Sequence, residues 1–220
     1  MNKILFVDDE QNIRRLVAYD LKQAGYDHTL CENGEEAYQA CVKDKYDVII
    51  VDWMMPLMDG LSLVKKLRQD HNPAIIIMLT AKDGEDSLLE AFEAGVDDYM
   101  RKPFSSRELI VRIKAHLSRV QTASTDVLAY HEIQLQLNSR SVNIHNNEVL
   151  LTKIEFDLLH LFIKEHPNVL SRDYLLNTIW GFDYDGDTRI VDIHVFNLRQ
   201  KIKIANVEIK SSRGIGYQLV

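Results

Sequence analysis

The first 120 residues alternate short apolar runs with stretches in which apolar residues recur every three or four positions. Three runs, Ile4–Val7, Val48–Val51 and Ile75–Leu79, are continuously apolar, as expected of strands buried on both faces. Strands that alternate with amphipathic helices predict βαβ units around a parallel sheet. The pattern therefore predicts a flavodoxin-like, doubly wound α/β sheet with five strands: Lys3–Asp8, Asp27–Cys31, Asp47–Asp52, Ala74–Leu79 and Asp97–Arg101.

The pattern changes in the last hundred residues. Gln121–Asp126 is polar and lacks apolar periodicity, which is typical of a linker. Residues 127–151 then predict short antiparallel strands, with a turn at Asn146–Asn147. We therefore expect a first domain over residues 1–120, a linker over 121–126 and a second domain over 127–220.

The remainder of the second domain predicts three helices and a closing β-hairpin. Thr152 and Glu155 fit a capping box at the start of the first helix. Together with the preceding strands, these elements predict an α+β winged helix-turn-helix. The expected helices and final strands are Lys153–Glu165, Arg172–Trp180, Arg189–Ile202, Val207–Ser211 and Gly216–Val220.

Composition excludes several classes of protein. The chain of 220 residues is 46% hydrophobic and 27% charged, which is unlike a disordered, collagenous or coiled-coil protein. No apolar run approaches the roughly 18 residues of a spanning helix, and Met1–Glu10 is not a signal peptide. Cys31 and Cys41 form neither a disulfide framework nor a metal motif. We expect a cytoplasmic protein with reduced thiols and no membrane partner.

Charge is distributed unevenly along the acidic chain. The net charge is −7, and residues 125–220 alone carry −2. Within them, however, residues 188–220 carry six basic residues against two acidic ones. Because polyanions respond to local patches more than to total charge, this segment is a candidate nucleic-acid contact.

Carboxylates end two of the predicted strands. Asp8 and Asp9 follow the first strand and Asp52 ends the third, and these strands are neighbours in the order 2-1-3-4-5. Converging like charges are costly unless they share a cation, and oxygen ligands favour Mg²⁺. Thr80 and Lys102 add a hydroxyl and a cation at the same edge, which suits an aspartyl phosphate. Any single strand-end aspartate more often only terminates its strand; all five positions together favour the functional interpretation.

These positions lie within motifs that resemble a known family. Residues 1–120 resemble a two-component receiver domain, through VDDE (7–10), VDWMMPLMDG (51–60), LTAK (79–82) and DDYMRKPF (97–104). Residues 127–220 resemble the winged-helix effector of the OmpR/PhoB subfamily, through LTKIEFDLL (151–159), SRDYLLNTIWG (171–181), RIVDIHVFNLRQKI (189–202) and RGIGY (213–217). Together the motifs cover nearly the whole chain in the right order.

The resemblance implies roles for the acidic residues. It implies that Asp52 is the phosphoacceptor and that Mg²⁺ lies on Asp9, Asp52 and the backbone carbonyl of Met54. Asp8 would support the metal, either directly or through water.

The resemblance also implies a switch and a special peptide bond. Thr80 and Tyr99 would form the switch pair, although Tyr99 on sequence alone is more often a half-buried strand aromatic. The Lys102–Pro103 peptide would be cis and would aim the lysine at the phosphoryl group.

In related regulators the receiver dimerises through charged pairs, and Asp98, Glu108 and Arg112 match such positions here. The basic partner usually found for Glu108 is replaced by Leu88. Leu88 either enlarges the apolar part of the interface or weakens it, and a position in the core is an equal alternative.

The Arg189–Ile202 segment is the candidate recognition helix. Its predicted buried stripe is Ile190, Ile193, Leu198 and Ile202, with the opposite side toward the major groove. The alternative is an ordinary amphipathic helix with a solvated face. Phe196 and Asn197 replace residues that are often basic in the subfamily, and Phe196 is either a thymine-methyl contact or a packing residue. The predicted DNA contacts are Arg189, His194, Asn197, Arg199, Lys201 and, in the wing, Arg213.

The leading hypothesis is a phosphorylation-switched transcription regulator rather than an enzyme beyond its own Mg²⁺-dependent phosphoryl transfer and autodephosphorylation. A sensor histidine kinase would phosphorylate it, and the homodimer would bind double-stranded promoter DNA. RNA polymerase is a further possible partner, through Asp183, Asp185 and Asp187. An aspartyl-phosphate hydrolase would need a general acid where Met54 stands, and a flavodoxin-like nucleotide binder would need a glycine-rich phosphate loop.

Overall fold

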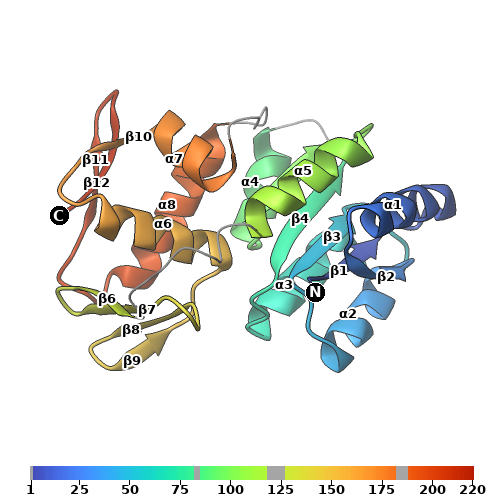
Figure 1. Cartoon of the computed structure of the whole chain (residues 1–220), viewed down its shortest axis with the longest axis horizontal. Coiled ribbons are helices and arrows are strands. Elements are labelled where there is room, and N and C mark those ends of the chain that lie inside the picture. Colours follow the sequence, from blue (N-terminus) through green and yellow to red (C-terminus); the bar gives the residue numbers. More distant parts are fainter. Residues whose placement is uncertain (1, 82–84, 118–126, 182–187) are drawn as a thin grey trace. The chain divides into compact units, whose positions relative to one another are not determined.

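The chain folds into two units, Met1–Leu117 and Ser118–Val220. The computed structural model, drawn in Figure 1, describes residues 2–81, 85–117, 127–181 and 188–220. The predicted linker over Gln121–Asp126 lies outside the described residues. Among the helices that are described, none combines the length and the apolar content that a membrane crossing requires.

The first unit is built on a five-stranded parallel sheet in the predicted order β2-β1-β3-β4-β5. Its strands are β1 (Lys3–Val7), β2 (Asp27–Cys31), β3 (Val48–Asp52), β4 (Ile75–Thr80) and β5 (Asp98–Arg101). Its helices are α1 (Gln11–Gln23), α2 (Gly34–Lys43), α3 (Gly60–Gln69), α4 (Glu85–Glu93) and α5 (Ser106–Leu117).

Helices cover both faces of this sheet, with α1 and α5 packed together on one face and α2 and α3 on the other (Figure 1). Side chains alternate across a strand, so Ile4 and Phe6 of β1 join Val17 and Leu21 of α1 in one core cluster. All residues of β3 and β4 are buried. This double-sided burial explains why the central strands are continuously apolar.

Gly60 closes the loop after β3 against the end of that strand. Its backbone N–H donates a hydrogen bond to the Trp53 carbonyl at 2.9 Å. A Cβ atom at position 60 would lie 2.1 Å from the carbonyl oxygen of Asp52, so only glycine fits without moving the backbone. The Asp59 side chain accepts from the Ser62 N–H and caps α3 at the same point.

In its described residues the second unit contains two antiparallel sheets and three helices. The first sheet joins β6 (Val127–Tyr130), β7 (Ile133–Gln136), β8 (Ser141–Ile144) and β9 (Asn147–Val149) in chain order. The predicted turn at Asn146–Asn147 is displaced by one residue, because His145 and Asn146 take the positive φ angles of 52° and 64°. Two successive positive φ angles are typical of a tight hairpin turn.

The helices are α6 (Lys153–Lys164), α7 (Arg172–Ile179) and α8 (Arg189–Ile202), close to their predicted bounds. The predicted capping box is confirmed, since Thr152 and Glu155 exchange side chain-to-backbone hydrogen bonds. The second sheet has the order β10-β12-β11, with β11 (Ile209–Ser212) and β12 (Gly216–Leu219) as the predicted hairpin. The two-residue β10 (Leu170–Ser171) is an addition that the pattern did not predict.

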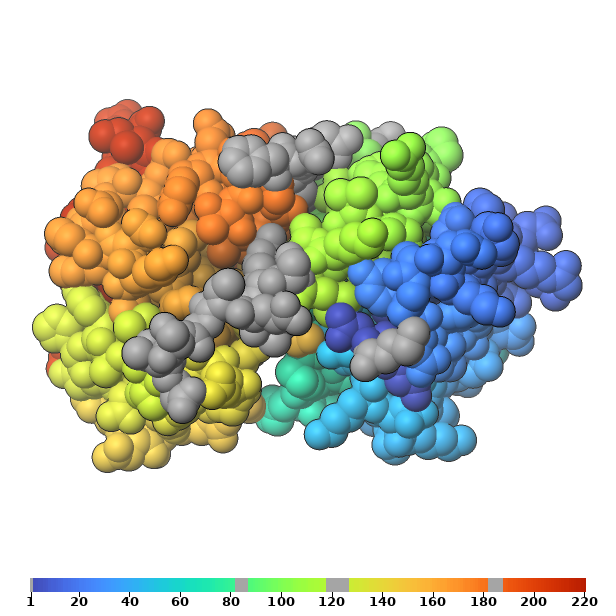
Figure 2. All heavy atoms as spheres, in the orientation of Figure 1, coloured from blue at the N-terminus to red at the C-terminus, as the bar shows by residue number. Residues whose placement is uncertain are grey.

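The β11–β12 hairpin forms the wing of this unit. Figure 2 shows its tip, in red, standing out from the surface. Gly216 lies against β10, because a Cβ atom there would lie 1.9 Å from the Leu170 carbonyl oxygen. Arg213 and Ile215 beside it are exposed. The base of the wing is therefore fixed while its tip presents side chains to the outside.

We expect Gly60→Ala to destabilise the first unit, because the added methyl group has no space beside Asp52. Overpacking of this kind typically costs about 1–3 kcal/mol. Urea unfolding of the full chain measures the change. Ser62→Ala, an exposed position in the first turn of the same helix, is the control and should stay within about 0.5 kcal/mol of the wild type. Equal stabilities of both variants would contradict the close packing.

Candidate functional site

Three carboxylates meet at the carboxyl edge of the first sheet. Asp8 follows β1 and Asp52 ends β3, and the paired residues Val7 and Val51 hold the two strand ends side by side. Asp8 and Asp52 are buried, whereas Asp9 is exposed. One carboxylate oxygen from each lies within 4.8 Å of the other two. The structure therefore brings together the three acids that the sequence predicted to converge.

Lys102 forms ion pairs with both buried carboxylates. Its Nζ lies 2.9 Å from an Asp8 oxygen and 3.0 Å from an Asp52 oxygen. The lysine backbone is held as well, since its N–H donates to the Thr80 carbonyl at 2.8 Å. The Lys102–Pro103 peptide bond is cis. One cation from the end of β5 thus spans the ends of β1 and β3.

Burial and charge oppose each other in this site. Desolvation raises the pKa of Asp52, and the hydrogen bond and charge of Lys102, which lower it, do not fully compensate. For Lys102, burial lowers the pKa, but the hydrogen bonds and charges of Asp8 and Asp52 outweigh it and the net pKa is raised. The lysine therefore carries its charge at neutral pH.

The donor set fits a hard divalent cation. Mg²⁺ takes oxygen ligands at about 2.0–2.1 Å and keeps several waters. The three carboxylate oxygens already lie within 4.8 Å of one another, so small side-chain rotations would let them bind one ion. The exposed Asp9 leaves room for those waters. Met54, whose backbone hydrogen-bonds to the Asp52 carboxylate, lies beside the same group. Asp8, Asp9 and Asp52 are therefore suited to hold Mg²⁺.

Thr80 and Tyr99 lie on neighbouring strands close to this edge. Thr80 ends β4 and is buried, and Tyr99 pairs with Met78, two residues before it. The Tyr99 ring is turned inward, edge-on to Phe92 of α4, with centroids 5.8 Å apart. The sequence-based alternative of a half-buried strand aromatic underestimated the burial of Tyr99, which is 6% exposed.

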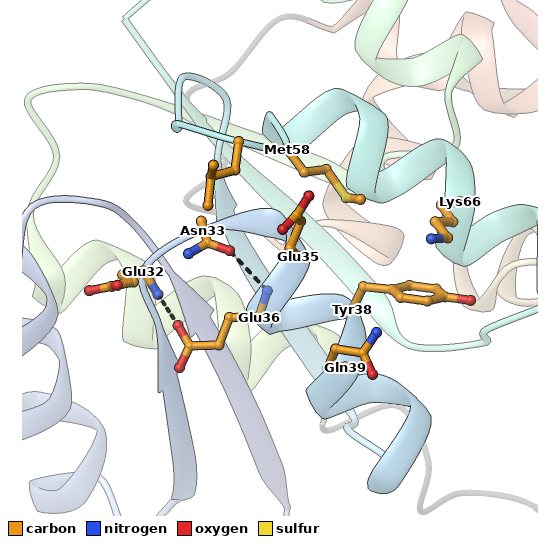
Figure 3. Close-up of a pocket in the computed structure, with 9 residues that line it drawn as sticks. Glu32, Asn33, Glu35, Glu36, Tyr38, Gln39, Met58 and Lys66 are labelled. Atoms are coloured by element: carbon orange, nitrogen blue, oxygen red, sulfur yellow. Dashed lines mark hydrogen bonds between the residues drawn. The ribbon is translucent and has the colours of Figure 1, made fainter.

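A separate cavity of about 510 Å³ lies between α2, α3 and the loop after β3 (Figure 3). Its lining includes Glu32, Asn33 and Glu36, which hydrogen-bond among themselves, and Lys66, which lies over the Tyr38 ring. Asp8, Asp9 and Asp52 are not part of this lining. The acid cluster is therefore at the sheet edge and not in this cavity.

The residues predicted for DNA contact divide into two groups in the structure. Arg189 and Arg213 are exposed, and Asn197 is partly exposed. His194 is 2% exposed and its ring lies against Trp180, with centroids 5.5 Å apart. The burial of His194 within the buried stripe of α8 argues against the predicted contact with DNA, which stays a prediction.

Arg199 and Lys201 have partners within the second unit. Arg199 donates to the Ile209 carbonyl at 2.6 Å and to the Ser211 hydroxyl at 2.9 Å, and so attaches α8 to the wing. Lys201 lies 2.6 Å from the buried Glu155 carboxylate of the capping box. Sequence reasoning assigned both cations to phosphate and missed these structural roles, because the partners lie on elements distant in sequence.

Comparison with known proteins identifies both units. Residues 4–114 match the model of the response regulator receiver domain. Residues 146–219 match the model named transcriptional regulatory protein, C terminal. The transcriptional regulatory protein SrrA of Staphylococcus aureus is 38% identical over 229 residues, covering 99% of this chain and 95% of its own. The chain belongs to the OmpR/PhoB family of two-component response regulators.

Solved structures agree with this family. The response regulator DrrB of Thermotoga maritima, an OmpR/PhoB homologue, is 28% identical with a TM-score of 0.53, covering 100% of this chain and 99% of that one. A RitR mutant has a TM-score of 0.77 over the same shares at 24% identity, which supports the fold alone. This response regulator therefore has a receiver domain, which implies a histidine kinase partner, and a winged-helix domain, which implies DNA binding.

The three residues predicted for dimerisation of the response regulator lie together within one receiver. Arg112 Nη1 lies 3.3 Å from Asp98, and Nη2 lies 3.0 Å from Glu108. His116, which sequence reasoning missed, adds its Nε2 at 3.1 Å from the second Asp98 oxygen. Asp98, Arg112 and His116 are all buried. The Arg112–Asp98 pair is thus an intrachain contact in this structure.

We expect Arg112→Met to cost about 3–5 kcal/mol of receiver stability, because it leaves the buried Asp98 carboxylate short of its main cation. Urea unfolding measures this loss. Arg107→Met, an exposed position on the same helix, should change stability by less than about 0.5 kcal/mol. The double variant with Asp98→Asn should lose less than Arg112→Met alone, and a larger loss would count against the pair.

Proposed function

We propose that Asp52 is the phosphoacceptor of this response regulator. A carboxylate oxygen of Asp52 attacks the phosphorus of a phosphohistidine on the kinase, the P–N bond breaks, and the imidazole leaves. The observation that supports this most is the position of Lys102, 3.0 Å from Asp52, where the phosphoryl oxygens would need a cation. Thr80 would donate its hydroxyl to the same oxygens.

The metal would complete this charge balance. Asp8, Asp9 and Asp52 would hold Mg²⁺, with the Met54 carbonyl as a further ligand. When bound, the ion would neutralise charge on the phosphoryl oxygens, as hard cations do in phosphoryl transfer. The chain's own part is to place the nucleophile: Gly60 allows the loop to close on the Asp52 backbone, and Lys102 holds the carboxylate.

The signal would leave the site through Thr80 and Tyr99. A phosphoryl group on Asp52 would accept a hydrogen bond from the Thr80 hydroxyl and so pull the end of β4 toward Asp52. The inward Tyr99 ring on β5 would stabilise the shifted strand end through its contact with Phe92. Thr80 and Tyr99 thus connect the site to the face formed by α4, β5 and α5. We propose that this face forms the homodimer.

Two exposed apolar side chains are available on that face. Leu89 on α4 is 38% exposed and Val111 on α5 is 47% exposed. Leu88, at the position where related regulators have a basic residue, is partly buried. The side chain of Glu108, which pairs with Arg112, is 40% exposed. Glu108 is therefore available to a second receiver, whereas Asp98 is buried.

The dimer would place two winged helices on promoter DNA. Arg189 and Arg213 would contact phosphates and the minor groove, and Asn197 would read a base edge. Arg199 and Lys201 would act indirectly, by fixing α8 against the wing and against α6. The predicted contact of residues 180–187 with RNA polymerase stays a prediction, since residues 182–187 lie outside the described part.

We expect Asp52→Asn to abolish acid-labile phosphate uptake from acetyl phosphate, because the variant keeps the shape of the site and lacks the nucleophile. Radiolabelled phosphate incorporation measures it. Glu35→Gln, an exposed carboxylate on α2, is the control and should incorporate phosphate as the wild type does.

Asp9→Ala completes this experiment. Asp9 is exposed and would be a metal ligand but not the acceptor. Phosphorylation of the Asp9→Ala variant should therefore need far more Mg²⁺, although its acceptor Asp52 is unchanged. Stoichiometric uptake by Asp52→Asn would contradict the acceptor assignment. An unchanged Mg²⁺ titration in Asp9→Ala would contradict the metal assignment.

We expect phosphorylation to convert the chain from monomer to dimer, and Val111→Glu to prevent this, because it buries a charge in the apolar part of the interface. Light scattering of phosphorylated protein measures the mass. Leu16→Glu, at an apolar position on α1 that is 58% exposed, should dimerise normally. A dimer in Val111→Glu that is lost in Leu16→Glu would place the interface on α1 instead.

A further inference from the structure

The exposed face of α8 has an apolar centre. Arg189, Ile193, Phe196, Gln200 and Lys203 follow the spacing of one helix face, and all are exposed except Ile193, which is partly exposed. Phe196 is 57% exposed, which removes the alternative that it packs in the interior. Val195, not Ile193, completes the buried stripe with Ile190 and Leu198. An aromatic ring thus stands at the centre of the presented face.

The cations near this centre are engaged elsewhere. Arg199 bonds to the wing strand β11 and Lys201 to the buried Glu155 of α6. The charges of the face therefore stand at its two ends, at Arg189 and Lys203, where they suit phosphates on either side of a groove. Between them lie the ring of Phe196 and, one helical turn on, the amide of Gln200.

Each type of group matches one feature of the major groove. An apolar side chain contacts the C5-methyl group of thymine, whereas a Gln amide pairs with N6 and N7 of adenine. Guanine is most often read by Arg or Lys, and the centre of this face offers neither. We propose that α8 reads an A·T-rich step, with Phe196 on a thymine methyl and Gln200 on a neighbouring adenine. This inference rests on the proposed DNA-binding function and adds the class of sequence recognised.

The test begins with selection of sites by the full chain, treated with acetyl phosphate, from a pool of random duplex DNA. Each thymine of the selected half-site is then replaced in turn by deoxyuridine, which differs only by the missing methyl group. We expect one replacement to weaken wild-type binding about fourfold, from roughly 0.8 kcal/mol for one buried carbon. Phe196→Ala should bind the thymine duplex more weakly, and the deoxyuridine at that position should cost it nothing further.

Arg213→Ala is the matched control. Its contact is with charge and groove shape, so it should weaken binding to thymine and deoxyuridine duplexes by the same factor. Gln200→Ala should relax the preference for adenine at the neighbouring position in a repeated selection. Because Phe196 and Gln200 are exposed, both variants should retain the fold, which circular dichroism checks.

The outcomes separate the inference from the proposed function. Failure of the wild type to enrich any duplex would overturn DNA recognition itself. Two outcomes would leave DNA binding in place and overturn the role of Phe196. In one, the wild type enriches a site, but replacing its thymines by deoxyuridine never weakens binding. In the other, the replacement weakens binding by Phe196→Ala as much as binding by the wild type. Unchanged selection by Phe196→Ala would assign the exposed ring to a protein partner instead.

Discussion

The receiver depends on one balance, the repulsion of two buried carboxylates against a single lysine. Asp8 and Asp52 end neighbouring strands, and without a shared cation their charges would oppose the pairing of β1 and β3 at that edge. Lys102 supplies the cation from β5, on the far side of β4. The same arrangement leaves negative charge in excess, which a divalent cation could neutralise. The charge balance that stabilises the strand ends is therefore also what suits the site to a metal ion.

Much of this arrangement was predictable because it follows from local periodicity. Five strands that alternate with helices predict a doubly wound sheet, and in the order 2-1-3-4-5 the ends of β1 and β3 bring Asp8, Asp9 and Asp52 together. The sequence-based prediction failed where the position of a residue depends on helix phase. Ile193 and Val195 are both apolar and two residues apart, so only the packed structure shows that Val195 is the buried one and that His194 is buried with it.

The second unit is acidic in total, although its predicted role is to bind DNA. Several of its charges form internal pairs, such as Lys201 with Glu155, Arg140 with Asp157 and Arg172 with Asp192. Such pairs hold α6, α7 and α8 in position and contribute little net field outside. Each pair cancels one charge of either sign and leaves the net charge of the unit at −2, so contact with a polyanion would depend on where the exposed cations lie, among them Arg189, Lys203 and Arg213.

The long sequence separation within the acid site has a consequence for newly made chains. Lys102 bonds to Asp8 across 94 residues, and both ends of that contact must be in place before the carboxylates are balanced. Contacts so distant in sequence slow folding, because the entropy of closing the intervening loop must be lost before they form. A nascent chain that has emerged from the ribosome only as far as β4 therefore lacks the lysine and cannot complete the site. If Asp52 is the phosphoacceptor, as proposed, the site becomes able to accept a phosphoryl group only when the receiver is complete.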